Sequence, residues 1–132
     1  MIEASLLFTA LLFGGTVLYA FGFAAFVFSA LPAETAGPLI RRAFPHFYLF
    51  VLGTSAIAAL LCIASDWNTA MILVAIAATT IVTRQVVMPA INAATDVGAS
   101  ARFKVLHTLS VAITLAHIVG TGIALLRLAA VV

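Results

Sequence analysis

The chain has 132 residues, of which 65% are hydrophobic and only 8% are charged, and its mean hydropathy is +1.29. Because about a quarter of the residues in an ordinary soluble domain are charged, this composition excludes a soluble protein. The net charge of +2 comes from scattered basic residues without a basic stripe, so we expect no nucleic-acid partner. The partner that the composition predicts is the lipid bilayer.

Four stretches without charged side chains approach or exceed the roughly 20 apolar residues that a membrane crossing needs. They predict an all-α fold, an integral membrane four-helix bundle that forms one transmembrane domain over residues 1–132. The predicted spans are approximately residues 4–30, 46–64, 69–88 and 103–126. A chain of this size leaves no room for a separate catalytic domain, and we expect a protein that is not an enzyme.

The first predicted span carries a polar stripe that should turn inward, because hydroxyl groups facing lipid would lack partners. The stripe follows spacings of three and four and consists of Ser5, Thr9, Leu12, Thr16 and Tyr19. Residues 31–45 then combine three prolines and Gly37 with Glu34, Arg41 and Arg42. We interpret this segment as a loop outside the lipid, with one helical turn near residues 39–43.

The second predicted span begins after Pro45 and carries Tyr48, Ser55 and Cys62 at intervals of seven residues. Residues 65–69 predict a tight hairpin, with capping side chains and a tryptophan suited to the membrane interface. The third span ends before Pro89. We interpret residues 89–101 as the second substantial loop.

The fourth predicted span carries the most informative pattern, a seam of polar side chains that lies along one helix face. Its members are His107, Ser110, Thr114, His117 and Thr121. An ionisable group at membrane depth marks a candidate functional site. For His117 the structural alternative is a neutral imidazole that is hydrogen-bonded to a facing hydroxyl.

The basic residues predict the orientation, because they concentrate on the cytoplasmic side of membrane proteins. One side carries Arg41, Arg42, Arg84, Arg102 and Lys104, and the other carries only Arg127. We therefore expect the two longer loops in the cytoplasm and both termini on the extracytoplasmic side. The expected location is the bacterial inner (plasma) membrane, as a multi-pass protein.

This topology gathers polar side chains at the cytoplasmic mouth of the bundle, where we predict a ligand-binding site. Its predicted members are His107, Asn92, Arg84, Asp96, Ser110 and His46, with His117 as a secondary candidate. We expect a protein that handles a small solute or a metal ion, or that assists a membrane complex, as a homo-oligomer or within a larger assembly. The alternative is a redox protein whose His46 and His107 bind haem b between the second and fourth helices. The metal, if any, and the cofactor are unknown at this stage.

The segment Met88-Pro89-Ala90-Ile91-Asn92, with the downstream Asp96, Gly98, Phe103, Leu106-His107 and Leu109-Ser110, resembles a known family. These are the small four-span proteins similar to transmembrane protein 205, catalogued in bacteria as a domain of unknown function. The resemblance implies a four-helix membrane protein without an established reaction. The motif positions that it singles out are Pro89, Asn92, Asp96, Phe103, His107 and Ser110.

Overall fold

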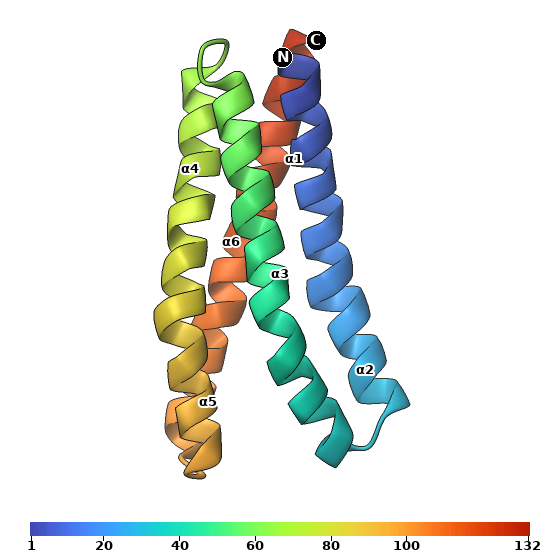
Figure 1. Cartoon of the computed structure of the whole chain (residues 1–132), viewed down its shortest axis with the longest axis vertical. Helices are drawn as coiled ribbons and strands as arrows, with labels where there is room; N and C mark the ends of the chain where they lie inside the picture. The colour runs from blue at the N-terminus through green and yellow to red at the C-terminus, as the bar shows by residue number, and fades with distance from the viewer.

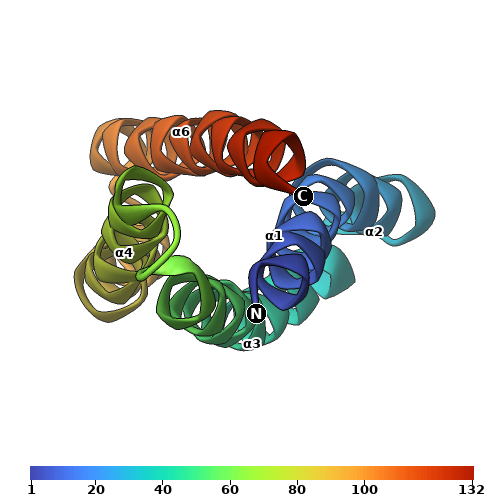
Figure 2. The ribbon, with the colours of Figure 1, turned by 90° about the horizontal axis from the view of Figure 1, so that it is seen from above.

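A computed structural model describes residues 1–132, and nearly all of them are helical. Four helical rods are each long and apolar enough to cross a membrane, which confirms the predicted all-α four-helix bundle and identifies a polytopic membrane protein. Both termini lie at one end of the bundle (Figure 1). Viewed from above, the rods form a ring in which each contacts two neighbours (Figure 2).

Two of the four rods are interrupted by short π-helical segments. The first rod consists of α1 (Ile2–Val17), the π-helical η1 (Leu18–Phe23) and α2 (Ala24–Ala30), and the second is α3 (Ala33–Cys62). The third consists of α4 (Trp67–Val82), the π-helical η2 (Thr83–Val87) and α5 (Met88–Asp96), and the fourth is α6 (Ser100–Val131). Such π turns inside α-helices are frequent at functional sites.

The loop predicted over residues 31–45 is wrong. The helix α3 begins at Ala33 and contains both Pro38 and Pro45. Each proline lacks one backbone N–H but keeps a φ angle that suits a helix, so it removes a single intrahelical bond and need not end the helix. Membrane helices tolerate such prolines when neighbouring helices surround them.

The loop predicted over residues 89–101 is also wrong for most of its length. Pro89 stands in the first turn of α5, and the rod continues to Asp96, so Asn92 and Asp96 lie on a helix. The π turn η2 ends at Val87, two residues before Pro89, whose missing N–H cannot form the usual bond to the carbonyl of residue 85. The actual turn is short and contains Gly98, whose φ of +69° is the left-handed conformation that glycine adopts readily.

The predicted polar stripe on the first rod does face the interior. Ser5, Thr9 and Thr16 are each at most 1% exposed. The Ser5 hydroxyl donates a hydrogen bond to the carbonyl oxygen of Ala58 on α3, at 2.8 Å. Large apolar side chains cover the outer surfaces of all four rods, as lipid contact requires.

The end that carries the termini is closed by a network around Asp66, the N-cap of α4. The Asp66 carboxylate accepts hydrogen bonds from the Thr69 backbone N–H, from the Thr69 hydroxyl and from the Arg127 guanidinium of α6. The Arg127 Nε–H also donates to the Thr69 hydroxyl oxygen at 2.9 Å. The hydrogen bonds from Arg127 and then from Thr69 lower the pKa of Asp66 from 3.8 to about 2. This network, the Asp66 clamp, joins the α3–α4 hairpin to the C-terminal helix.

Candidate functional site

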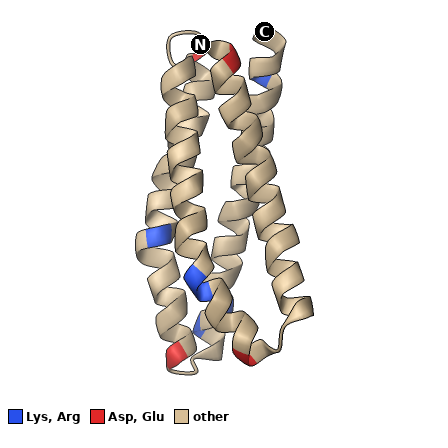
Figure 3. Ribbon diagram, turned by 45° about the vertical axis from the view of Figure 1, so that its right-hand side comes forward, with Lys and Arg blue, Asp and Glu red and all other residues tan.

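The opposite end of the bundle divides into two arms. One arm consists of α2 and the first half of α3, and the other consists of η2, α5 and the first half of α6 (Figure 1). Helix α2 packs mainly against α3, and α3 packs closely against α4 but has little contact with α5. The charged residues lie at the end that carries the termini and in the half that contains the arms (Figure 3).

A cavity of about 920 Å³ lies between the two arms. Of its 22 lining residues 13 are hydrophobic, including Phe21 and Phe28 from the first rod and Phe103 from α6. The first π turn contributes Phe21, and the second comes directly before the lining residue Met88. Both interruptions of the helical rods therefore adjoin this cavity.

The predicted polar residues fall into three groups in the structure. Asn92, His107 and Ser110 line the cavity. Arg84 and Asp96 do not line it, but each connects the two arms. His46 is exposed on α3 and does not line the cavity.

Four polar side chains that line the cavity make no side-chain hydrogen bond to another residue: Glu34, Tyr48, Asn92 and His107. The ring of His107 stacks on Phe103, with centroids 5.5 Å apart and planes inclined by 6°, so its nitrogens remain free at the ring edge. Neither His107 nor Asn92 makes a side-chain hydrogen bond to another residue, whereas Ser110 donates to the His107 carbonyl at 2.8 Å. Asn92 and neutral imidazole can each donate and accept hydrogen bonds, so the pair can bind a polar group of a ligand.

Two arginines bridge the arms on either side of these groups. Arg41 of α3 binds Asp96 of α5 through two hydrogen bonds, Nη1 to Oδ1 at 2.6 Å and Nη2 to Oδ2 at 3.0 Å. The Nε–H of Arg84 in η2 donates to the carbonyl oxygen of Pro45 at 3.3 Å. Arg41 also lines the cavity, which sequence reasoning missed because it treated this residue only as a marker of orientation.

The sequence carried a signal that identifies Arg41. The seven-residue repeat of Tyr48, Ser55 and Cys62 extends backwards to Arg41 and Glu34 if the helix continues. Tyr48, Arg41 and Glu34 all line the cavity, and Ser55 and Cys62 are fully buried. A loop at residues 31–45 would end the repeat at Tyr48, which is why the predicted loop hides Arg41.

His117 lies deeper in the bundle and does not line the cavity. Its Nε2 is 2.7 Å from the hydroxyl oxygen of Thr79 on α4. The Thr79 hydroxyl is also 2.7 Å from the Ala75 carbonyl oxygen, and the tautomer of His117 decides which group donates in the contact between His117 and Thr79. This is the facing hydroxyl that the structural alternative for His117 requires.

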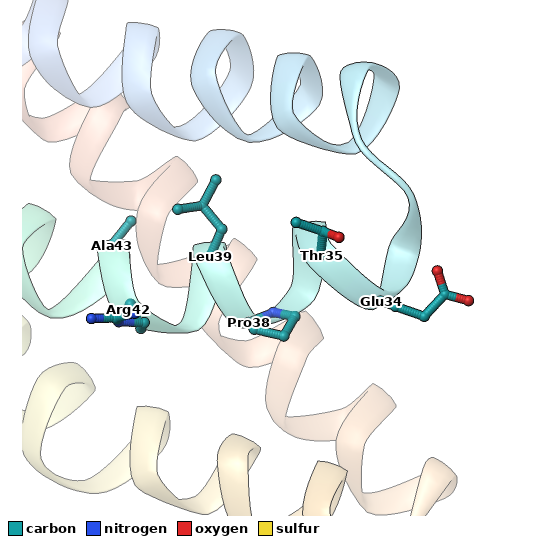
Figure 4. A pocket seen from close by; sticks show the side chains of 6 residues that line it. All are labelled: Glu34, Thr35, Pro38, Leu39, Arg42 and Ala43. Carbon is teal, nitrogen blue, oxygen red and sulfur yellow. The ribbon is translucent and has the colours of Figure 1, made fainter.

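A second hollow, of about 550 Å³, lies beside the first half of α3. All its lining side chains come from that one helix, and Glu34 and Arg42 point apart (Figure 4). No cluster of three or more His, Cys, Asp or Glu side chains in the chain is placed to hold a metal ion. The cavity between the arms is therefore the candidate site.

A protein family described as a domain of unknown function (DUF4149) matches residues 7–100. No curated protein and no solved structure matches the chain. The matched range includes Arg41, Asn92 and Asp96, and it ends before His107 and Ser110 of α6.

Proposed function

The chain belongs to the DUF4149 family of unknown function, and we propose that it binds a small solute, without catalysis, in the cavity between its two arms. Asn92 and His107 form the core of this site, and Ser110 lines it beside them. Asp96 and Arg84 support the site by bridging the arms. The observation that carries the proposal is a largely apolar cavity whose lining includes polar side chains without hydrogen-bond partners, Asn92 and His107 among them.

Physical chemistry favours a ligand at this position. Asn92 is half-buried and His107 is exposed, so a ligand can reach both side chains, and each can donate and accept hydrogen bonds. Ligand sites are typically clefts of about 300–1,000 Å³ with mostly apolar walls and a few polar groups that orient the ligand. The cavity of about 920 Å³ between the arms has both properties.

The alternatives have less support. The Ser110 hydroxyl donates to a carbonyl of its own helix, so it does not form a nucleophilic pair with the His107 ring. Haem held between the second and fourth rods would need His46 and His107 on one cavity, and only His107 lines it. Metal handling would need further ligands from a partner, because no cluster of three ligating side chains is present.

The membrane orientation is part of the proposal. Basic residues concentrate at the end with the arms, so we place that end in the cytoplasm and both termini outside a bacterial inner membrane. In a Cys62→Ala background, cysteines at Thr35 and Ala99 should resist impermeant thiol reagents added outside, and one at Asn68 should react. Labelling at Ala99 from outside would show that the orientation is the opposite one.

A role in transport would further require a homo-oligomer or a larger membrane complex, because four helices enclose little space. The likeness to transmembrane protein 205 stays a prediction.

The solute-binding proposal is tested by filling the cavity. Gly37 lines it, and a Cβ added there meets no atom within 4 Å, so Gly37→Phe places a ring in the cavity without a backbone clash. Gly14 is exposed on α1, also has open space and does not line the cavity, so Gly14→Phe is the matched control.

The measurement is mass spectrometry of small molecules extracted from the purified full-length protein. We expect a molecule that copurifies with the wild type, Gly14→Phe and His117→Ala, but is depleted from Gly37→Phe, His107→Ala and Asn92→Ala. Protection of the buried Cys62 thiol from reaction with a maleimide shows that each variant is folded. If every copurifying molecule is equally abundant in Gly37→Phe and Gly14→Phe, the cavity does not bind a solute.

A further inference from the structure

The cavity is open toward the side of the bundle. Phe21, Phe28 and Val111 all line it, and they are 53%, 56% and 41% exposed. Because these side chains lie within helices that can span the membrane, the exposed parts of them face lipid chains. A molecule with an apolar body can therefore enter between α2 and α6 directly from the bilayer. The apolar majority of the lining matches such a body.

A molecule with an apolar body also has a polar head, and the polar groups of the cavity restrict the charge that this head can carry. The charged residues that line it are Glu34 and Arg41, and Arg41 is already neutralised by Asp96 in a two-point ion pair. Glu34 is exposed and its charge is screened by solvent, so the cavity offers neither an anionic nor a cationic head a buried countercharge. An ion without a countercharge is costly in apolar surroundings.

The uncharged groups that remain unpaired are the hydroxyl of Tyr48, the amide of Asn92 and the imidazole of His107. They are complementary to oxygen atoms of hydroxyl or carbonyl groups, which need no countercharge. Resting on the proposed solute-binding function, we propose that the ligand is an uncharged amphiphile from the bilayer whose head bears hydroxyl or carbonyl oxygens. Asn92 and His107 bind the head, and the aromatic side chains of α2 and α6 contact the apolar body.

Three photoreactive probes with the same diazirine-bearing chain separate the head types: a monoacylglycerol, an alkyl sulfonate and an alkyltrimethylammonium. They are added to the full-length protein in phosphatidylcholine nanodiscs, and crosslinked peptides are mapped by mass spectrometry. We expect the monoacylglycerol to label peptides of α2 and α6 at the lowest concentration. Gly37→Phe should abolish this labelling, and Gly14→Phe should preserve it.

Two near-isosteric variants test the binding of the head. Asn92→Leu removes the amide, and His107→Phe removes the ring nitrogens while keeping a ring that can stack on Phe103. Each removes about one neutral hydrogen bond, so we expect the monoacylglycerol concentration for half-maximal labelling to rise about fivefold to tenfold. Labelling by the two charged probes should change less.

The outcomes separate this inference from the proposed function. If the sulfonate or the ammonium probe labels the cavity more strongly than the monoacylglycerol, or if Asn92→Leu and His107→Phe leave labelling unchanged, the uncharged head is refuted while solute binding stands. If no probe labels the cavity in a manner that depends on Gly37, binding of a bilayer amphiphile is refuted. The copurification experiment then still decides independently whether another solute binds.

Discussion

Removal of the Asp66 carboxylate should destabilise the bundle more than removal of the Asp96 carboxylate. Both aspartates form an ion pair with an arginine, at opposite ends of the molecule: Asp96 accepts from two guanidinium nitrogens of Arg41, and both oxygens of Asp66 accept from Nη2 of Arg127. Asp66 additionally caps α4, and its side chain is 10% exposed, whereas that of Asp96 is 56% exposed. The substitutions Asp66→Ala and Asp96→Ala therefore form a matched pair.

The magnitude for Asp66→Ala follows from two contributions. Loss of an N-cap side chain costs about 1 kcal/mol. The ion pair adds about 1 kcal/mol, because Arg127 is 43% exposed and solvent weakens the attraction. The free energy of unfolding should fall by about 2 kcal/mol, which corresponds to a decrease of roughly 5–10 °C in the unfolding midpoint. Asp96→Ala should lower the midpoint much less.

The buried thiol of Cys62 reports unfolding directly. Cys62 is the sole cysteine, is fully buried and accepts the backbone hydrogen bond of Asp66 at its carbonyl. A maleimide dye that fluoresces on reaction with thiols therefore follows thermal unfolding of the purified protein in detergent. Equal midpoint decreases for the two alanine variants would refute the argument from capping and burial, as would an unchanged midpoint for Asp66→Ala.

The clamp also predicts a dependence on pH. Because the folded-state pKa of Asp66 is lowered from 3.8 to about 2, its stabilising contribution is fully present above about pH 4. That contribution is lost as the pH falls through about 2. The midpoint difference between the wild type and Asp66→Asn should therefore stay constant from pH 8 to pH 5 and shrink below pH 4. A difference that already shrinks between pH 7 and pH 5 would contradict the assignment.

Two further predictions concern α1 and use the same thiol assay. A Cβ on Gly15 would lie 2.6 Å from the Phe50 ring, so Gly15→Ala should lower the midpoint, whereas Gly14→Ala, with open space, should raise it through the better helix propensity of alanine. The reverse order would show that the Phe50 ring moves aside freely. The Thr16 hydroxyl is buried without a partner, so Thr16→Val should stabilise the fold by about 1 kcal/mol. Thr9→Val should not, because the Thr9 hydroxyl donates to the Ser5 carbonyl at 2.8 Å, and equal effects of the two valines would refute this account.

The sequence alone determined the number and type of the spanning elements. Apolar stretches without charge must satisfy their backbone groups internally in lipid, and a helix does so within one segment. Spacings of three, four and seven residues then predicted which face of the first, second and fourth rods is polar and turned inward. Ser5, Thr9 and Thr16 are buried as this rule requires, and His107 and Ser110 lie on the seam that faces the cavity.

Local rules failed at the prolines. Pro38, Pro45 and Pro89 suggested loops, but each removes only one backbone hydrogen bond, and the remaining bonds and helix packing keep the rods continuous. This error hid the continuation of the seven-residue repeat to Arg41. It also hid the fact that His46 faces away from the cavity. His46 is two residues from Tyr48 and therefore about 200° around the helix from the face that lines the cavity.

Only the tertiary structure decided that the rods separate into two arms, that a cavity lies between them and that Arg41 meets Asp96 across it. Periodicity along one helix specifies a face but not the neighbour of that face or the distance to it. Those depend on how the side chains of four rods pack together. The hydrogen bond from Ser5 to Ala58 and the Asp66 clamp hold one end together, while α2 and α5 remain apart at the other.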